Sequence, residues 1–316
     1  MPVRPANEEA IAAAAQALAD GDLVAFPTET VYGLGANALD AHAVARVFAA
    51  KERPRFNPLI VHVPNLAAAE SYGVFDATAH KLAQAFWPGP LSLVLPLRPG
   101  CGIADLVTAG LGTIALRVPN HTVAQALLAK AKLPLAAPSA NRSGRISPTS
   151  ASHVEAELSD TPAMILDGGP CKHGLESTVV GVAGGEPVLL RLGSVPREAI
   201  EAVLGHAIAD AEENAAISSP GQLERHYAPE TKLRLGATDL REGEALLAFG
   251  PNAPQGASAS INLSATGNVE EAASHLFAAL RELDAKKASG IAVMPIPAHG
   301  LGEAINDRLQ RAAKAR

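Results

Sequence analysis

Polar residues gather directly after short apolar runs that have the character of β-strands. The segment 27–35 follows the run that ends at residue 26 and mixes threonines with glycines. The segments 137–149 and 167–178 repeat this arrangement with serine, asparagine and glycine. Open α/β sheets bind ligands at the carboxyl ends of their strands, and backbone N–H groups at a helix N-terminus favour anions. Each cluster is by itself compatible with an ordinary turn, but their repetition predicts one shared ligand-binding crevice.

A basic segment supplies charge for such a crevice. Lys51, Arg53 and Arg55 lie close together in a loop that prolines at 54 and 58 stiffen. Arg117 ends a further predicted strand, and Arg191 directly follows another. Arginine binds phosphate and carboxylate oxygens through charge-assisted, bidentate hydrogen bonds. Although a charged run is usually a solvated turn, these cations together predict a site for a polyphosphate and a small carboxylate.

Several standard catalytic signatures are absent from the sequence. It has no G-x-x-x-x-G-K-[ST] phosphate loop, no H-E-x-x-H metal helix and no G-x-S-x-G nucleophile elbow. The Gly-Leu-Gly-Ala segment at 33–36 lacks the third glycine of a dinucleotide fingerprint. No pair of acids dominates the clusters, and no Cys–His or Ser–His spacing suggests covalent catalysis. The sequence therefore predicts a site without protein metal ligands, which works by positioning and charge stabilisation.

Composition excludes several classes of protein. The 316 residues suggest two domains at about 150 residues each, and 48% apolar residues suffice for buried cores. No apolar stretch approaches the ~18 residues that a bilayer requires, and a net charge of −6 argues against a general nucleic-acid coat protein. Cys101 and Cys171 predict idle thiols rather than a disulfide framework. Glu8 and Glu9 stand where a signal peptide is basic, which predicts a cytoplasmic protein.

Strands alternate with helices between residues 22 and 204, which predicts a layered α/β domain. Strands are expected at 23–26, 59–61, 91–95, 113–118, 133–137, 163–166, 178–182 and 187–190, and helices at 8–20, 40–50, 76–87, 121–132, 149–158 and 197–204. A second α/β pattern has strands at 245–249 and 291–294, helices at 269–285 and from 303, and a loop at 251–260 expected to be mobile. The predicted organisation is a first domain at 1–205, a linker at 206–230 and a small domain at 231–316.

Ordered motifs along nearly the whole chain resemble those of one enzyme family. The motifs are Pro27-Thr28-Glu29-Thr30-Val31-Tyr32-Gly33-Leu34-Gly35, Lys51-x-Arg53-Pro54-x-x-Asn57-Pro58-Leu59, Phe86-Trp87-Pro88-Gly89-Pro90-Leu91, Pro138-Ser139-Ala140-Asn141, Gly174-x-Glu176-Ser177-Thr178, Ser219-Pro220-Gly221, Arg225-His226-Tyr227-Ala228-Pro229 and Gly302-Glu303-Ala304-Ile305-Asn306-Asp307-Arg308-Leu309. In this order they resemble the threonylcarbamoyl-AMP synthase family in its long form, in which a small domain follows a YrdC-like domain.

The resemblance implies a fold and an activity. The fold would be a twisted, open mixed-sheet α/β domain of the YrdC type around a deep concave site, followed by a smaller Rossmann-like α/β domain. The enzyme, a nucleotidyltransferase, would make L-threonylcarbamoyl-adenylate and pyrophosphate from L-threonine, bicarbonate and ATP, with Mg²⁺ accompanying ATP. A separate transferase complex would use the adenylate to modify adenosine 37 of tRNA. This chain would contact tRNA weakly and have no membrane partner.

The resemblance also implies roles for individual residues. The residues expected at the centre of catalysis are Lys51, Arg53, Ser139 and Asn141. Contacts to ATP are expected from Arg53, Asn57, Thr113, Ser139, Ser147, Arg191, His226 and Tyr227. Contacts to threonine are expected from Thr30, His62, Arg117, Ala137 and Ser177. Arg117 suits a carboxylate fork on physical grounds, whereas His62 is also compatible with a buried structural histidine.

The linker is where the chain departs from the family pattern. The segment around His226 and Tyr227 would fold over the mouth of the site and exclude water from an unstable carbamate. Gln222-Leu223-Glu224 replaces an expected Met-Lys-aromatic stretch, and Phe56 stands where an acid is common. We therefore expect normal chemistry with altered lid closure. Alanine at His226 and Tyr227 should lower turnover without unfolding the first domain, and unchanged kinetics would contradict the lid.

Two other functions remain open at this point. A carbamoyl-adenylating domain of the same fold would act on carbamoyl phosphate, but such domains usually belong to larger chains with acylphosphatase-like and zinc-finger parts. An RNA-binding module without chemistry would need a basic concavity and stacking aromatics. The net charge of −6 and the 3% of aromatic residues argue against such a module. Thermal stabilisation by ATP with magnesium would separate an enzyme from an RNA module.

Overall fold

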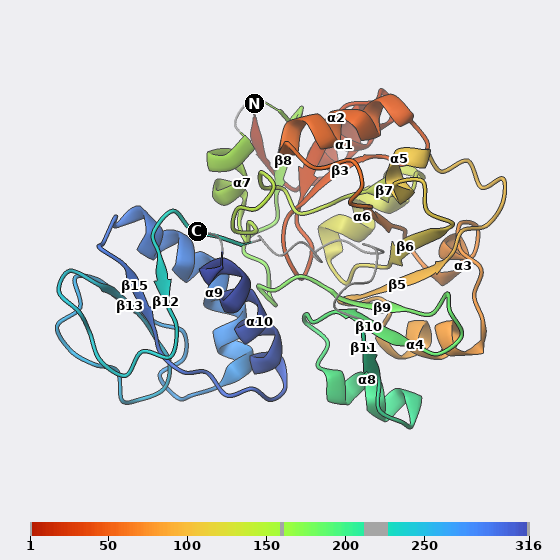
Figure 1. The fold of residues 1–316 in the computed structure, drawn as a ribbon. Helices are drawn as coiled ribbons and strands as arrows, with labels where there is room; N and C mark the ends of the chain where they lie inside the picture. The colour runs from red at the N-terminus through yellow and green to blue at the C-terminus, as the bar shows by residue number, and fades with distance from the viewer. Residues whose placement is uncertain (1, 159–160, 212–226, 315–316) are drawn as a thin grey trace.

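The computed structural model describes residues 2–158, 161–211 and 227–314 and has two β-sheets, one in each of two bodies (Figure 1). The larger body holds a mixed sheet and the smaller body a parallel one. This arrangement confirms the predicted fold class, a mixed-sheet α/β domain with a second, smaller α/β domain. In the part of the chain that the structure describes, no helix is both long enough and apolar enough to span a bilayer.

The large sheet is mixed and holds eleven strands within the described residues. In order across the sheet they are β1 (Val3–Pro5), β8 (Met164–Asp167), β2 (Val24–Phe26), β3 (Gly33–Asn37), β7 (Leu135–Ala136), β4 (Ile60–His62), β6 (Thr113–Arg117), β5 (Leu91–Pro96), β9 (Thr178–Gly181), β10 (Val188–Arg191) and β11 (Ala209–Asp210). The strands predicted in this body are confirmed, with small shifts at their ends. β4 and β6 run parallel and pair His62 with Arg117, so two predicted site residues meet at neighbouring strand ends.

Three helices of the larger body begin with capping side chains at the starts of predicted helices. The described helices are α1 (Glu8–Ala19), α2 (Ala41–Lys51), α3 (Leu66–Ala69), α4 (Ala77–Phe86), α5 (Asp105–Thr108), α6 (Thr122–Ala131), α7 (Ala151–Leu158) and α8 (Arg197–Leu204). The side chains of Asn7, Asp40 and Asp76 accept hydrogen bonds from first-turn N–H groups of α1, α2 and α4. Such caps satisfy backbone donors that the helix leaves unpaired.

Alternation along the strands assigns side chains to the two faces of the large sheet. Ala25 lies in the main apolar core with residues of α2, α4 and α8, whereas Phe26 lies in a second core with α1 and α6. The His62 ring meets the Phe26 ring edge-on at a centroid distance of 6.2 Å, so it lies on this second face. Arg117 is the register partner of His62 and lies on the same face. This face therefore carries the predicted site.

The small body packs against the larger one through two helices. Its parallel sheet has the order β12 (Leu233–Arg234), β15 (Ile291–Val293), β13 (Ala245–Ala248) and β14 (Ser260–Asn262). α9 (Val269–Ala285) and α10 (Leu301–Ala313) lie between this sheet and the larger body (Figure 1). Val31, Ile146 and Leu175 of the larger body join the apolar core around these helices. The two bodies therefore share a buried apolar core.

Sequence reasoning is wrong at several points of the fold. Residues 33–37 form β3, where the sequence predicts part of a ligand-binding turn, and residues 260–262 form β14 at the end of the predicted mobile loop. Gly35 suits β3 because a Cβ there would lie 2.7 Å from the Phe26 ring. β11 belongs to the large sheet beyond residue 205. Residues 212–226 of the predicted linker lie outside the described residues, and the domain boundaries stay predictions.

Candidate active site

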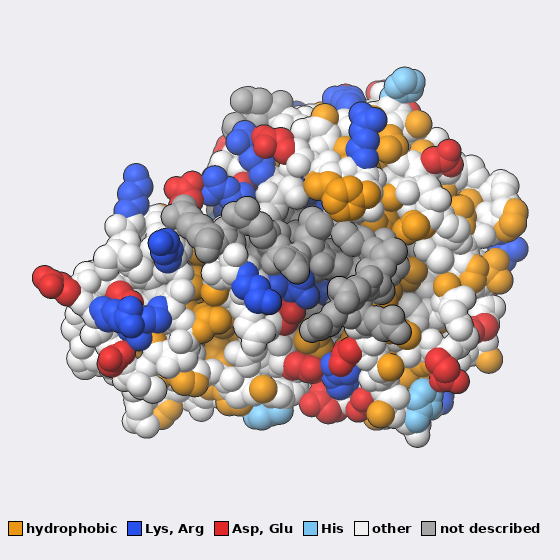
Figure 2. Space-filling view, viewed as in Figure 1, with side chains coloured by type: hydrophobic (Ala, Val, Ile, Leu, Met, Phe, Trp, Pro, Cys, Tyr) orange, Lys and Arg blue, Asp and Glu red, His pale blue; other side chains and the backbone are white. Residues whose placement is uncertain are grey.

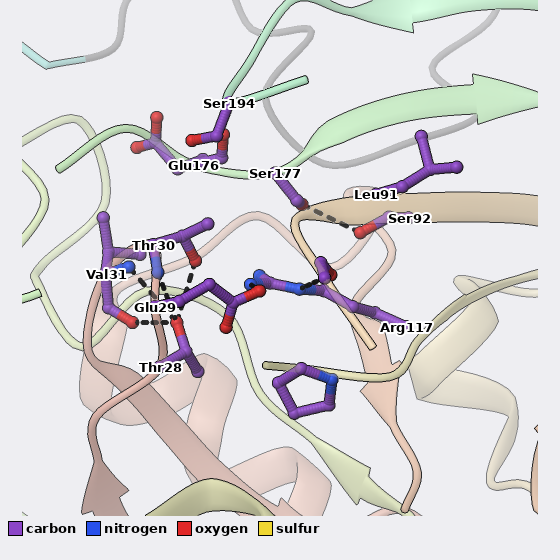
Figure 3. A network of polar contacts seen from close by, with 12 residues as sticks. Thr28, Glu29, Thr30, Val31, Leu91, Ser92, Arg117, Glu176, Ser177 and Ser194 are labelled. Atoms are coloured by element: carbon purple, nitrogen blue, oxygen red, sulfur yellow. Dashed lines mark hydrogen bonds and ion pairs between the residues drawn. The ribbon is translucent and has the colours of Figure 1, made fainter. Parts of the chain in front are cut away.

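A cavity on the second face of the large sheet collects residues from the three polar segments and from the basic segment that the sequence singles out. Its lining residues are Thr28, Thr30, Val31, Gly33, Arg53, Ile60, His62, Arg117, Ala137, Pro138, Ser139, Glu176, Ser177, Arg191 and Tyr227. They come from the turn between β2 and β3, the loop after α2, strand β4, the ends of β6 and β10, and the segments that follow β7 and precede β9. Tyr227 comes from the segment that precedes β12. Figure 3 shows Thr30, Arg117 and Ser177 converging from three of these elements.

The structure brings nine of the predicted site residues to this cavity. They are Thr30, Arg53, His62, Arg117, Ala137, Ser139, Ser177, Arg191 and Tyr227. Five others, Lys51, Asn57, Thr113, Asn141 and Ser147, are not among the residues that line it, and their expected roles stay predictions. His226 and the departing segment Gln222-Leu223-Glu224 lie outside the described residues.

A buried ion pair stands at one part of the cavity wall (Figure 3). Arg117 Nη2 donates to Glu29 Oε1 at 2.7 Å, and both side chains are 4% exposed. Burial raises the pKa of Glu29, but the charge and hydrogen bonds of Arg117 outweigh it and hold the pKa below its usual value. Glu29 therefore stays ionised. Because Nη2 donates to Glu29, a bound carboxylate would meet other N–H groups of Arg117.

His62 is a buried, uncharged ring beside this pair. Burial, together with the Arg117 charge, lowers the pKa of His62 to about 3. Its Nδ1 has no hydrogen-bond partner among the described residues. A neutral imidazole carries one donor and one acceptor nitrogen. His62 can therefore offer a ligand a directional hydrogen bond without adding charge.

Replacing His62 with glutamine should make the protein less sensitive to acid. An unfolded histidine takes up a proton below about pH 6.5, whereas folded His62 stays neutral to about pH 3. Protons therefore favour the unfolded state as the pH falls, and His62 should cost about 2 kcal/mol of stability between pH 6.5 and pH 5. Urea unfolding at pH 7 and pH 5 measures the loss. His42→Gln, which alters an exposed histidine, should lose as much stability as wild type between pH 7 and pH 5. If wild type, His62→Gln and His42→Gln all lose the same amount, the role of His62 in acid sensitivity is wrong.

Arg53 and Arg191 bring two more cations to the cavity wall. Arg53 donates from Nε and Nη2 to the carbonyls of Asn57 and Pro58 at 3.2 and 2.9 Å. Burial and the Arg191 charge lower the pKa of Arg53 to about 9, so it remains protonated at neutral pH. Arg191 donates from Nη2 to the carbonyl and hydroxyl oxygens of Ser177 at 2.7 and 3.0 Å. Neighbouring cations repel each other unless an anion lies between them, so this wall suits phosphate oxygens.

Lys51 acts on the cavity through the backbone. Its Nζ donates to the carbonyl of Ser139 at 2.5 Å and to that of Asn141. Burial holds the pKa of Lys51 well below its usual value. The Asn141 amide donates to the carbonyls of Arg142 and Arg145 at 2.8 and 2.9 Å. Lys51 and Asn141 therefore fix the loop that presents Ser139 to the cavity. Their expected place at the centre of catalysis stays a prediction.

Two residues expected to contact ATP, Thr113 and Asn57, are not among the residues that line the cavity. Thr113 begins β6 and Arg117 ends it, and a strand rises about 3.3 Å per residue, so the two are about 13 Å apart. Asn57 is fully buried, and neither its Oδ1 nor its Nδ2 has a hydrogen-bond partner among the described residues. Unpartnered buried amide atoms are costly, and such atoms are expected where a ligand completes a site.

Three acidic or hydroxyl residues have structural roles that the sequence did not assign. Thr28 Oγ1 donates to the Val31 carbonyl at 2.7 Å and accepts from backbone N–H groups of the same turn (Figure 3). Glu29 pairs with a cation, and Glu176 accepts from Ser147 Oγ at 2.5 Å, which places Ser147 behind the wall. The ion pairs of Glu29 and Glu176 could have been predicted from their positions in the sequence. Each acid follows or precedes a predicted strand in a crevice rich in arginine, where a carboxylate is expected to pair with a cation.

Gly193 packs directly on the backbone of the cavity wall. A Cβ at this position would lie 2.4 Å from the Glu176 carbonyl oxygen and 2.5 Å from the Ser177 carbonyl carbon. Gly193→Ala should therefore shift the segment that carries Ser177, cost about 1–3 kcal/mol and lower turnover about tenfold or more. Gly184→Ala is the matched control, because nothing lies within 4 Å of its Cβ. Urea unfolding and turnover assays of both variants test this, and indistinguishable variants would contradict it.

Comparison with known proteins finds relatives along the whole chain. The family Sua5_yciO_yrdC, described as "Telomere recombination", matches residues 16–193, and the family described as "Threonylcarbamoyl-AMP synthase, C-terminal domain" matches residues 195–314. Threonylcarbamoyl-AMP synthase of Bacillus subtilis is 41% identical over 98% of this chain and 94% of that protein. The Pyrococcus abyssi protein of the same name is 41% identical over 97% of this chain and 95% of that protein.

A solved structure supports the same relationship. The structure of P. abyssi Sua5 complexed with L-threonine matches with a TM-score of 0.90 at 38% sequence identity, over 98% of this chain and 96% of that one. These whole-length relatives favour the synthase interpretation over an RNA-binding module or a carbamoyl-phosphate enzyme. With this identity over nearly the full length of both proteins, the chain belongs to the threonylcarbamoyl-AMP synthase family.

Proposed function

We propose that the cavity joins L-threonine, bicarbonate and ATP into L-threonylcarbamoyl-adenylate and releases pyrophosphate. The observation that carries this proposal is one cavity whose wall has both an Arg117–Glu29 pair beside neutral His62 and two further buried arginines. The first surface suits the carboxylate of a small amino acid, and the second suits a polyphosphate. Family membership supports the same substrates.

Threonine would lie against Arg117 and His62. The remaining N–H groups of Arg117 would hold its carboxylate, and the unpartnered Nδ1 of His62 would meet a polar atom of the substrate. Thr30 and Ser177 offer hydroxyl groups at the cavity wall, and Ala137 offers backbone there. The structure of a relative from P. abyssi in complex with L-threonine supports threonine as a ligand.

The triphosphate would lie against Arg53, Arg191 and Ser139. Lys51 and Asn141 would act behind them by holding the Ser139 loop. Mg²⁺ would enter as part of the MgATP substrate, since the carboxylates nearest the cavity, Glu29 and Glu176, each accept hydrogen bonds from an arginine. Tyr227 lines the cavity and would lie close to the nucleotide, and His226 stays a prediction for the same role.

The proposed reaction has two steps. The free amine of threonine attacks the carbon of CO₂ or bicarbonate, and a carbamate forms with loss of a proton or of water. A carbamate oxygen then attacks the α-phosphorus of ATP, the bond between that phosphorus and the bridging oxygen breaks, and pyrophosphate leaves. No protein nucleophile takes part, so the wall residues contribute alignment and charge stabilisation. Alignment matters because a carbamate decomposes in water unless it reacts at once.

Isotope labelling tests the identity of the product. The full chain is incubated with MgATP, threonine and ¹³C-bicarbonate, and the products are examined by mass spectrometry and ¹³C NMR. We expect label in a carbamoyl carbon that links threonine to AMP, and no such species when threonine is omitted. Release of AMP and pyrophosphate without any labelled adduct would contradict the proposal.

The downstream expectations are part of the same proposal. The adenylate would pass to a separate transferase complex that modifies adenosine 37 of tRNA, and this chain would contact tRNA weakly in the cytoplasm. The net charge of −6 supports weak tRNA contact, because nucleic-acid affinity depends on neutralising phosphates with basic residues.

A further inference from the structure

Ion pairs join the two bodies of the protein at their junction. Figure 2 shows Lys and Arg side chains gathered along this junction on one face of the molecule. Among the described residues, the pairs that cross it include Arg197–Glu303 at 2.9 Å, Arg281–Glu157 at 3.0 Å and Arg308–Glu176 at 3.0 Å. Of these residues, Glu176 lines the cavity. The Arg308–Glu176 pair therefore connects the small body with the site itself.

Arg308 lies on α10 of the small body and is 1% exposed. Its Nε donates to Glu176 Oε2 at 3.0 Å and its Nη2 donates to the Leu192 carbonyl at 2.7 Å, while Nη1 contacts Asp307 Oδ2 at 2.5 Å. Arg308 and Glu176 are separated by 132 residues in the sequence. The planar guanidinium uses its fork to hold two separate segments of the larger body at once.

Both segments held by Arg308 continue directly into the cavity wall. Glu176 precedes Ser177, and Leu192 follows Arg191. Arg191 and Ser177 are themselves joined by hydrogen bonds of 2.7 and 3.0 Å. Figure 3 shows Glu176 and Ser177 side by side on the segment that leads into β9. A shift of the Arg308 guanidinium would therefore move Glu176 and Leu192, and with them the neighbouring cavity residues Ser177 and Arg191.

Arg308 also contacts an aromatic residue of the wall. Its guanidinium carbon lies 4.8 Å from the centre of the Tyr227 ring, a distance typical of a cation–π contact. Tyr227 stacks on Phe277 of α9 with a centroid distance of 5.5 Å. Two side chains of the small body, Arg308 and Phe277, therefore support the wall at Tyr227.

We propose that Arg308 is a positioning residue of the active site, through which the small body sets the placement of Glu176, Ser177 and Arg191. This inference rests on the proposed synthase function. It gives the small body a role in turnover besides its role in packing. Misplacement of reacting groups by about 1 Å can cost on the order of a hundredfold in rate, so loss of this support should be visible in kcat.

Two substitutions at 308 separate geometry from charge. Arg308→Met removes both the charge and the hydrogen-bond donors of the guanidinium. Arg308→Lys keeps the charge but has a single nitrogen, which cannot replace the separate bonds to Glu176 and to the Leu192 carbonyl. We expect both variants to lower kcat about ten- to a hundredfold, with Arg308→Lys less affected in thermal stability. If Arg308→Met does not fold, the kcat of Arg308→Lys remains the deciding measurement.

Glu303→Gln is the matched control. It weakens the Arg197–Glu303 pair, which also crosses the junction at 2.9 Å but does not touch the cavity lining. If junction packing alone matters, Glu303→Gln and Arg308→Lys should have the same kcat. If Arg308 positions the site, kcat of Glu303→Gln should stay within about twofold of wild type, as expected for a partly exposed ion pair.

A double-mutant cycle with Glu176→Gln completes the test. Pyrophosphate release is measured for wild type, Arg308→Lys, Glu176→Gln and the double variant, each with saturating substrates. Because the effect is proposed to pass through Glu176, the double variant should lose less than the product of the two single losses. Independent losses, or wild-type kcat in Arg308→Lys, would overturn the inference. A wild-type chain that does not need threonine would instead overturn the proposed function, so the two failures are distinguishable.

Discussion

Replacing Arg117 with methionine should lower kcat/KM for threonine by about a hundredfold or more and should also destabilise the fold. In the proposed complex its guanidinium holds the threonine carboxylate, and loss of one preorganised donor in a water-poor site typically costs about 10² to 10³ in rate. The substitution also leaves the carboxylate of Glu29, which is 4% exposed, without its cationic partner. Breaking a buried ion pair costs about 3–5 kcal/mol. Steady-state kinetics and urea unfolding measure the two losses separately.

A second substitution distinguishes these two effects. Adding Glu29→Gln to Arg117→Met removes the stranded charge, so the free energy of unfolding should recover in large part. Activity toward threonine should stay low, because the cation for the substrate carboxylate is still missing. If activity recovers together with stability, Arg117 acts through packing alone and its assignment to threonine is wrong.

Replacing Arg53 with methionine should affect ATP rather than threonine. Two hydrogen bonds of Arg53 go to the neutral backbone carbonyls of Asn57 and Pro58, so its charge remains available to a phosphate group. We expect kcat/KM for ATP to fall by about 10² to 10³ and the KM for threonine to change little. Initial rates over a grid of both substrate concentrations measure the split.

Arg55 provides the matched control for this loss. It lies in the same loop but is exposed, next to Phe56, which is 58% exposed. Arg55→Met removes the same charge and should leave the kinetics near wild type. Equal effects of Arg53→Met and Arg55→Met, or a main effect on threonine, would contradict the placement of the triphosphate.

Local signals in the sequence predicted much of the fold. Asn7, Asp40 and Asp76 were recognisable as N-caps because their side chains satisfy first-turn donors, and α9 has the predicted bounds, Val269–Ala285. β3 was missed because its glycines have low strand propensity. The structure uses Gly35 there for close approach to Phe26, which only the packed sheet reveals.

The site likewise has features that local sequence predicts and features that only the packed structure shows. The position of Arg117 at the end of a predicted strand indicated its place in the crevice, whereas His62 was expected only from the family resemblance. The structure pairs the two at the ends of neighbouring parallel strands. The direction in which a side chain points was not predictable: Lys51 turns to backbone carbonyls instead of the cavity. The contact between Arg308 and Glu176 depends on how the two bodies pack, and no local pattern encodes it.

The central claim is that one cavity condenses threonine, bicarbonate and ATP, and pyrophosphate release tests it most directly. Release from MgATP is measured for the full chain with threonine and bicarbonate each present or omitted, after dissolved CO₂ has been removed. Our account predicts rapid release only when both are present, and a strong loss in Arg117→Met. Release that needs neither co-substrate, or no release under any condition, would contradict it.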